Sequence, residues 1–540
     1  MSSVTDRRDP LDGRDVTMAA PPATPRWRLA ALSRGVRRTE VADPLVVGLV
    51  ALVVYALHGY HGVLDRDPAM FLYGGEHVAH GVPPYVAIFN SVGPLADAVP
   101  GLAIWLGHFV GVGPVLSARL LFTVLSALCC VLVSVLARDT LGSRAAGLVA
   151  PAVFLTFENF LQLATDGPRE KTTMVLFLLG CLILLGRRQW LVAGACAALA
   201  TLTWQPALAA ALGALVAATL LEPRGGRRGS LLRFVAGGVV PSLAAVVYFW
   251  AAGAFSRAWD GFVVMNVRYT EQPSALSDPH VLWTMLWDNY HLTIVLAIVG
   301  LLAVLVLGVR AVPHARRSIV TPLGTPVARR LVVVASGCAA AAIWTVRAIN
   351  GAPDLFVLLP FAAVGAAGVV MLVLVRLPGR TALVATAAVV CLGVVVAGTE
   401  AVSTRDDGLL AQRRDIAAVL GSLPGDPSVV TLNAPQVLAL TDRQSPTPYQ
   451  YFSGSAVRYL EATYPGGMRG FLTSLEALHP EVVAVGTSFK GLWPYGWLTR
   501  DYVRIGTGVG VSWYLSRSLG PDAIARARVA HHRALFFYRG

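Results

Sequence analysis

The chain has 540 residues, of which 55% are hydrophobic and 14% are charged, and its mean hydropathy is +0.62. Soluble domains are nearer half apolar and a quarter charged, so this composition argues against a soluble enzyme and predicts a polytopic membrane protein. The net charge of +13 is mostly arginine, which indicates cytoplasmic loops; no stripe of basic and aromatic residues suggests nucleic-acid binding. The six cysteines lie in apolar runs without zinc or redox spacing.

The N-terminal residues 1–40 are polar and rich in Arg, Pro and Asp, without the apolar core of a signal peptide. We expect a disordered cytoplasmic tail there. Five arginines between residues 26 and 38 precede the first apolar run, 44–64, and place the N-terminus inside.

Residues 41–399 are predicted to form the transmembrane domain, with 65–112 as a long first external loop. The apolar segment 96–112 contains Asp, Pro, His and several Gly residues, so we interpret it as a short helix in the membrane interface. With that segment outside, the later basic loops all fall inside. The resulting spans, about eleven, are 44–64, 115–137, 145–163, 172–185, 191–204, 207–221, 234–252, 291–307, 331–349, 355–375 and 381–397. A longer aromatic loop is expected at 255–290.

Residues 400–540 have the mixed polar and apolar composition of a soluble domain. We expect a C-terminal extracytoplasmic α/β domain there. Helices are predicted at 414–423 and 470–478, strands at 428–432 and 482–485, and a hairpin at 502–505 and 511–516. The segment PTPYQYF, 446–452, suits either loop packing or aromatic stacking on a sugar.

A stretch with several polar residues interrupts the apolar sequence after the first span: LDRDPAMFLYGGEHVAHGVPPYVAIFNSVGPL, residues 64–95. It contains Asp65, Asp67, Glu76 and His77 directly after the first span. Charged side chains are costly near hydrocarbon, so their presence there indicates a functional site. A second external stretch, ATDGPREK at 164–171, carries another acid and basic side chains, and the predicted topology lets the two stretches meet.

The stretch 65–95 resembles the first external loop of the GT-C glycosyltransferases, in particular the protein O-mannosyltransferase and lipid A aminoarabinose transferase group. The family's acid after the first span aligns best with Asp67, and Gly81, Pro84 and Tyr85 match its Gly-Pro-Tyr element. Val92 stands where the family often has a lysine, so a different cation must meet the donor phosphate.

The resemblance continues in outline along the membrane part. Arg119 lies early in the second span, where the family often has an arginine, and Asp166 takes the place of a second acidic position. The resemblance implies a GT-C fold and inverting transfer of a sugar from a polyprenyl-phosphate donor. Arg169 and Lys171 are the candidates to replace the lysine that is missing at Val92.

Such a transfer needs a carboxylate to accept the proton of the attacking hydroxyl and a cation to stabilise the departing phosphate. Asp67 is the expected base or acceptor-orienting acid, Asp166 is the second candidate, and Asp65 is a supporting neighbour. Arg169 and Lys171 are the expected phosphate contacts. A divalent metal is an alternative for the same task, although no ligand spacing is diagnostic, and no cofactor is assigned.

Each of these residues also has a structural interpretation. Asp67 could cap a helix beginning near Pro68, and Arg169 and Lys171 could be interfacial side chains. Further residues are candidates for the pocket but could equally form polar faces or belts: Glu76, His77, Tyr85, Arg119 and Glu158.

The sequence thus predicts a multi-pass membrane glycosyltransferase acting on the outer face of the cytoplasmic membrane. Its expected partners are a polyprenyl-phosphate-linked sugar, membrane lipids, and a lipid, glycan or protein acceptor. The alternatives are a transporter or lipid-carrier flippase, whose polar residues would lie at mid-membrane, and a non-catalytic membrane scaffold.

Overall fold

The computed structural model describes residues 36–270, 277–320 and 326–539. From residue 42 onward, the described residues form one compact unit. The disordered tail predicted for residues 1–40 lies outside the described residues, apart from the first residues of helix α1.

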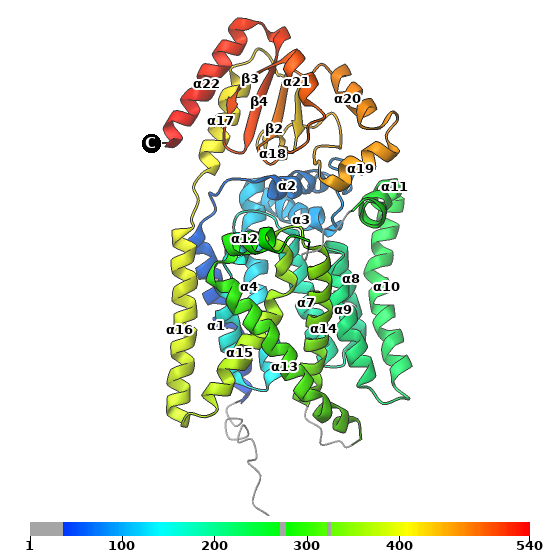
Figure 1. Cartoon of the computed structure of the whole chain (residues 1–540), viewed down its shortest axis with the longest axis vertical. Coiled ribbons are helices and arrows are strands. Elements are labelled where there is room, and N and C mark those ends of the chain that lie inside the picture. The colour runs from blue at the N-terminus through cyan, green and yellow to red at the C-terminus, as the bar shows by residue number, and fades with distance from the viewer. Residues whose placement is uncertain (1–35, 271–276, 321–325, 540) are drawn as a thin grey trace, which may run out of the picture. The chain divides into compact units, whose positions relative to one another are not determined.

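Helices make up the apolar part of the chain, and each expected span overlaps one of them (Figure 1). These are α1 (Val36–His58), α4 (Pro114–Leu141), α5 (Arg144–Leu155), α7 (Glu170–Gly186), α8 (Trp190–Thr203), α9 (Ala207–Leu220), α10 (Arg227–Ala251), α13 (Leu292–Val320), α14 (Pro326–Ala348), α15 (Leu359–Leu374) and α16 (Gly379–Ser403). By length and composition, α4, α10, α13, α14 and α16 are suited to cross a membrane; α1 contributes a shorter apolar stretch, Ala42–His58, and the other helices are shorter. The chain is therefore a multi-pass helical membrane protein, while the number of crossings stays a prediction.

Two expected segments differ from the structure. The span expected at 145–163 is broken after α5, and a short helix α6 (Glu158–Gln162) follows. The break lets Phe154, Phe157 and Phe160, all fully buried, pack against one another. The loop expected at 255–290 is largely helical: it contains α11 (Phe255–Trp259), the π-helix η2 (Asp260–Tyr269) and α12 (Pro279–Tyr290).

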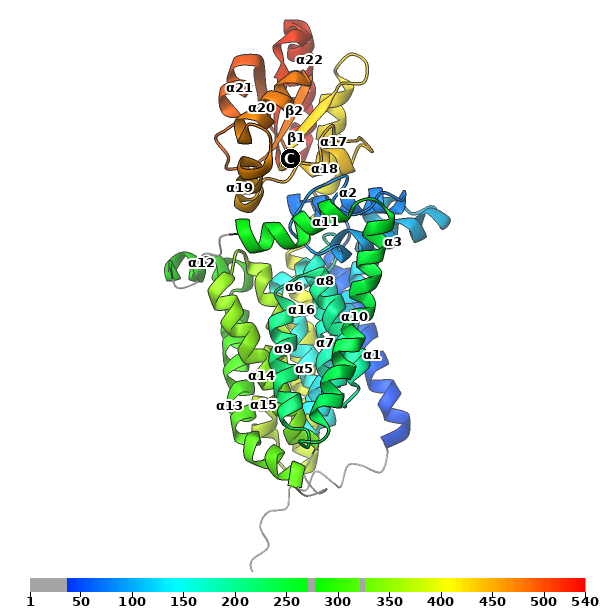
Figure 2. The ribbon, with the colours of Figure 1, turned by 90° about the vertical axis from the view of Figure 1, so that its right-hand side faces the viewer.

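The first external loop forms two packed helices, α2 (Arg66–Ala79) and α3 (Leu95–Phe109). Gly75 permits their close approach, because a Cβ there would lie 2.9 Å from the backbone nitrogen of Gly101. The short helix predicted at 96–112 is confirmed as α3. Figure 2 shows α2 and α3 next to each other, with α8, α9 and α10 in the neighbouring bundle.

Arginines that were expected in cytoplasmic loops meet acids at one end of the helices. Arg187 pairs with Asp139 at 2.7 Å, and Glu222 pairs with both Arg188 and Arg329 at 2.9 Å. The ends of α4, α7, α9 and α14 that carry these residues therefore lie together, as the alternation of the basic loops predicted.

The C-terminal part contains a four-stranded sheet of order β1-β2-β4-β3. Its strands are β1 (Val429–Leu432), β2 (Val482–Gly486), β3 (Tyr502–Thr507) and β4 (Val511–Ser516). β1 and β2 pair in parallel, and both are buried along their whole length. β3 and β4 form the predicted antiparallel hairpin.

Helices surround this sheet, and α17 packs against α22 (Figure 1). They are α17 (Leu409–Gly421), α18 (Pro435–Ala439), α19 (Gly454–Thr463), α20 (Gly467–Ala477), α21 (Tyr495–Asp501), the 3-10 turn η4 (Arg517–Leu519) and α22 (Pro521–Arg539). The fully buried Trp513 donates its indole N–H to Asp415, whose other oxygen bonds His531. This buried polar contact ties β4 to both helices.

Hydrogen bonds between side chains and the backbone attach the C-terminal part to α2 and to the residue before its N-cap. The amide of Gln412 donates to the carbonyl of Leu64 at 3.0 Å and accepts from its N–H at 2.9 Å. The N–H of Ser445 donates to the Tyr73 hydroxyl of α2 at 2.9 Å. These contacts bring the segment 445–458 over α2.

Candidate active site

Asp67 lies in the first turn of α2, and two arginines hold its carboxylate. Arg66 Nε donates to Oδ1 at 2.8 Å, and Arg169 Nη1 donates to Oδ2 at 3.0 Å. The N-cap of the helix is Asp65, whose side chain makes no capping hydrogen bond. Asp67 is therefore not the helix cap, and its carboxylate joins the two external stretches that the sequence predicted to meet.

The ion pairs continue from Arg169 into the start of α7. Glu170 Oε2 lies 3.7 Å from Arg169 Nε, and Glu170 Oε1 lies 2.7 Å from Lys171 Nζ. Lys171 Nζ also lies 3.2 Å from Asp354 Oδ1, in the turn η3 (Ala352–Val357). Arg169, Glu170, Lys171 and Asp354 are each less than 9% exposed. Buried charges need such partners, because each one has lost its hydration.

A cavity of about 690 Å³ opens beside this chain of charges. Asp67 and Lys171 line it together with Val92, the position at which the expected lysine is missing. Lys171 and Val92 therefore line the same cavity. Asp354, Glu170, Trp204, Gln205, Asn266, Trp344, Tyr451 and Arg458 are among the other lining residues.

Two aromatic rings cover cations at this cavity. The guanidinium carbon of Arg66 lies 4.8 Å from the centre of the Tyr451 ring, and Lys171 Nζ lies 5.2 Å from the Trp204 ring. A cation over a ring face is stabilised by the ring quadrupole, more strongly where water is excluded. These contacts hold Lys171 at the cavity wall and hold Arg66 against Tyr451, which lines the cavity.

The electrostatics keep Asp67 ionised. Burial alone would raise its pKa, but Arg169 and Arg66 outweigh burial and lower the pKa to about 2. Burial likewise lowers the pKa of Arg169, while Glu170 and Asp67 raise it above its ordinary value overall. At neutral pH the Asp67 carboxylate is therefore a hydrogen-bond acceptor, suited to orient a hydroxyl that points into the cavity.

Asp166 does not line this cavity. Its backbone carbonyl accepts from Arg119 at 2.9 Å, and its carboxylate lies 3.8 Å from His58. Burial raises its pKa to about 7, which Arg119 opposes and Asp406 and Asp65 reinforce. Burial also raises the pKa of Asp65, with Asp67 and Asp406 adding to the effect. The structure thus separates Asp166 from Asp67, which the sequence placed in one site.

The remaining pocket candidates also lie away from the charged cavity. Arg119 is fully buried and donates to the carbonyls of Tyr60, Gly62 and Asp166. Glu158 pairs with His291 at 2.5 Å, and His77 Nδ1 bonds the carbonyl of Tyr73. Glu76, in the last turns of α2, has a pKa that burial and Asp442 raise to about 8.

Tyr85 is fully buried, and its hydroxyl donates to the carbonyl of Val92 at 2.6 Å. It contacts the charged cavity only through that wall residue. The Gly-Pro-Tyr element of the resemblance therefore fixes the loop that ends at Val92.

Sequence reasoning missed Asp354 and Arg458 as site residues, and it named Tyr451 only within the aromatic segment 446–452. Asp354 follows the break Asn350-Gly351 between two apolar runs, and its Oδ2 accepts both of those backbone N–H groups. An acidic residue in a short break between two apolar spans could therefore have identified Asp354 as a candidate site residue. Arg458 carries no comparable signal, and the aromatic pattern of 446–452 does not show that Tyr451 meets Asp67, because only the folding of the C-terminal part over α2 brings both residues to the cavity.

An apolar groove adjoins the charged cavity. It has a volume of about 1160 Å³ and runs along α9, α13 and α14. Trp344 lines both the groove and the charged cavity. Arg347 lies near that end, while Arg224, Arg227 and Arg316 line the groove near the basic ends of the helices.

Metal binding finds no support in the acids of this site. Among residues 36–270, 277–320 and 326–539, no group of three or more His, Cys, Asp or Glu side chains is placed to hold a metal ion. Both oxygens of Asp67 are bound by arginines, and Glu170 and Asp354 are bound by Lys171. The residues present do not fit a divalent cation, so no step is derived through one.

Comparison with known proteins gives a likeness in structure. No model of a known protein family matches the sequence, and no curated protein sequence matches it. ArnT from Cupriavidus metallidurans in the apo state superposes with a TM-score of 0.53 at 16% identity, over 89% of this chain and 100% of ArnT. The same protein bound to undecaprenyl phosphate gives 0.50 at 16% identity, over 88% and 99%. The oligosaccharyltransferase of Archaeoglobus fulgidus gives 0.49 at 13% identity, over 89% and 74%.

ArnT is the lipid A aminoarabinose transferase, and these structural neighbours are GT-C glycosyltransferases. The likeness to ArnT covers most of both chains. The chain therefore has the GT-C fold, as the first external loop predicted.

Proposed function

We propose that the protein is a membrane glycosyltransferase that moves a sugar from a polyprenyl-phosphate donor to an acceptor hydroxyl on the outer face of the cytoplasmic membrane. The observation that carries this proposal is that Asp67 and Lys171 line the same cavity. That cavity adjoins an apolar groove at Trp344. A polyprenyl chain suits the groove, because its lining is mostly apolar, and its phosphate would reach the cavity end.

In the proposed reaction the acceptor hydroxyl attacks the anomeric carbon of the donor sugar. The carbon–oxygen bond to phosphate breaks and the configuration inverts, while the Asp67 carboxylate orients the hydroxyl, takes its proton as the new bond forms and passes the proton on to the more basic leaving phosphate. Lys171 and Arg458, both at the cavity, stabilise the charge that develops on the leaving phosphate. Arg169 does not line the cavity and acts through Asp67, whose carboxylate it binds.

Asp67→Asn removes the carboxylate that accepts the proton and keeps its size. General-base catalysis contributes roughly a hundredfold or more, so we expect transfer to fall by at least that factor. The measurement is mass spectrometry of lipid-linked sugars and envelope glycans in cells that carry each variant. An accumulating polyprenyl-phosphate sugar would identify the donor.

Asp407→Asn is the matched control, since that carboxylate lies in an exposed loop with a relative side-chain exposure of 64%. Membrane levels of both variants must equal those of the wild type. Normal transfer by Asp67→Asn in cells without a paralogous enzyme would refute the role of Asp67. Movement of the lipid carrier across the membrane without sugar transfer would favour a flippase.

A further inference from the structure

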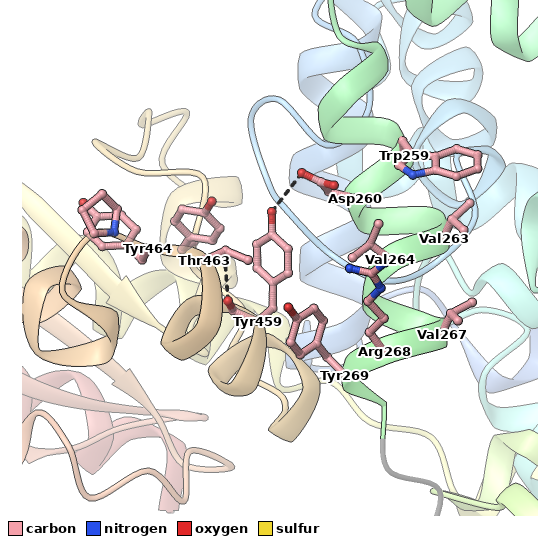
Figure 3. Close-up of a pocket in the computed structure, with 12 residues that line it drawn as sticks. Trp259, Asp260, Val263, Val264, Val267, Arg268, Tyr269, Tyr459, Thr463 and Tyr464 are labelled. Atoms are coloured by element: carbon pink, nitrogen blue, oxygen red, sulfur yellow. Dashed lines mark hydrogen bonds between the residues drawn. The ribbon is translucent and has the colours of Figure 1, made fainter.

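A second cleft lies between η2 and α19. Its main cavity measures about 770 Å³ and is lined by Tyr269, Tyr449, Tyr459, Tyr464 and Trp259, with Asp260, Arg268 and apolar residues (Figure 3). A neighbouring cavity of about 440 Å³ shares Asp260, Tyr449, Tyr459 and Tyr464 with it. The two cavities therefore form one aromatic cleft, a name we keep for these shared and lining residues.

The lining of the aromatic cleft combines flat rings with hydrogen-bonding groups. Trp259 at its edge is 51% exposed. The carboxylate of Asp260 faces Tyr459 and accepts its hydroxyl at 3.0 Å, and Arg268 lies close by (Figure 3). Sugars offer apolar C–H faces to aromatic rings and hydroxyl pairs to carboxylates and guanidinium groups. A concave, aromatic lining with a few polar groups suits such a ligand.

The rings are fixed by their neighbours. The Tyr459 ring lies 5.1 Å from that of Phe89 and 5.6 Å from that of Tyr269, measured between centroids. Phe89 also packs edge-on against Tyr449 at 5.5 Å. The cleft is thus preformed, and a ligand would spend little free energy on ordering it.

One wall separates the aromatic cleft from the charged cavity. In α19, Arg458 lines the cavity and the next residue, Tyr459, lines the cleft. In η2, Asn266 lines the cavity, while Tyr269 lines the cleft. Arg458 Nε donates to the carbonyl of Tyr269 at 2.8 Å, so a residue of the cavity is bonded to a residue of the cleft. A chain-like ligand in the cleft would therefore lie next to the charged cavity.

We infer that the aromatic cleft binds a saccharide chain, and that this chain is the carbohydrate part of the acceptor. The second statement rests on the proposed transferase function, whereas the first does not. A proline-rich peptide also favours aromatic grooves. The carboxylate of Asp260 at the centre favours a ligand with many hydroxyl donors, which prolines lack.

The test is saturation-transfer NMR with the full-length protein in detergent and a panel of neutral trisaccharides of pyranose and furanose sugars. Trp259→Ala and Asp260→Asn should each weaken binding by about tenfold. Trp283→Ala is the matched control, because this tryptophan is 45% exposed and does not line the cleft. Thermal unfolding verifies that all variants are folded.

A second arm separates this inference from the proposed function. Lys171→Met should lose binding of undecaprenyl phosphate and keep binding of the trisaccharides, whereas Trp259→Ala should do the reverse. Absence of trisaccharide binding at millimolar concentration, or equal binding by Trp259→Ala, would overturn the inference. So would preferential binding of a proline-rich peptide. If the wild type binds the trisaccharides but not undecaprenyl phosphate, the result counts against the transferase function and still supports the saccharide site.

Discussion

Three acids of the polar stretches 64–95 and 164–171 differ in pKa because of their nearest partners. Asp67 meets two guanidinium groups, which outweigh burial and bring its pKa to about 2. Arg119 donates to the backbone carbonyl of Asp166, and its charge only partly offsets burial, which raises the pKa of the Asp166 carboxyl to about 7. Burial and Asp442 raise that of Glu76 to about 8. Position along the chain does not distinguish them, but contact with arginine does.

Glu76 predicts a pH dependence of stability. Its pKa is raised from 4.5 to about 8 in the folded protein, so between these values the folded state keeps a proton that the unfolded chain has lost. Its contribution to stability is full below the unfolded pKa and is lost as the pH rises through about 8. Glu76→Gln stays neutral, so its melting temperature should exceed that of the wild type increasingly from pH 6 to about 9.

The check is thermal unfolding in detergent across that pH range. Asp407→Asn, in an exposed loop, should follow the wild type at every pH. A constant difference between Glu76→Gln and the wild type would contradict the assigned protonation.

At the scale of elements, Arg119 shows how one helix fixes two loops. It begins in the first turns of α4 and reaches carbonyls at Tyr60, Gly62 and Asp166, at 2.7, 2.8 and 2.9 Å. These carbonyls belong to the loop after α1 and to the loop before α7. The same two loops lead into Asp67 and Arg169, so Arg119 positions the ion pair without touching it.

Arg119→Lys keeps the charge but cannot reach three carbonyls at once. A stranded buried acceptor costs about 1–3 kcal/mol, so the variant should lose at least about 2 kcal/mol of unfolding free energy. We expect a lower melting temperature and weaker transfer. Arg233→Lys, on the exposed side of α10, should leave both unchanged. A stable, fully active Arg119→Lys would show that the loops are held elsewhere.

At the scale of the whole molecule, the charged cavity is assembled from distant parts of the chain. Asp67 comes from α2, Lys171 from α7 and Asp354 from η3, whereas Tyr451 and Arg458 come from the C-terminal part. The two hydrogen bonds between Gln412 and Leu64 attach that part close to α2. The cavity therefore depends on an attachment that contributes no lining residue.

Gln412→Ala should loosen this attachment, since it leaves the N–H and the carbonyl of the fully buried Leu64 without partners, at about 1–3 kcal/mol. We expect faster limited proteolysis between α16 and α17, and reduced transfer although every cavity residue is intact. Arg414→Ala, exposed on the same helix, is the control. Unchanged proteolysis and transfer would show that other contacts suffice.

Much of the fold could be predicted, because apolar length and the placement of arginines act locally along the chain. Each expected span overlaps a helix, and the short helix α3 and the hairpin β3–β4 lie where the pattern placed them. The helices α11, η2 and α12 were missed, because their apolar residues show no clear helical periodicity. Contacts with other elements stabilise this part of the chain, such as that of Tyr269 with Tyr459.

For the site, the sequence by itself determined that Asp67, Arg169 and Lys171 belong to two polar stretches beside apolar spans, because unpaired charges are too costly there to be incidental. Only the tertiary structure decided which charges meet. It joined Asp67 to Arg169, moved Asp166 to another cluster and added Asp354, Tyr451 and Arg458. The physical reason is that pairing of buried charges depends on distances of a few ångströms between segments far apart in the chain, and no local pattern specifies those distances.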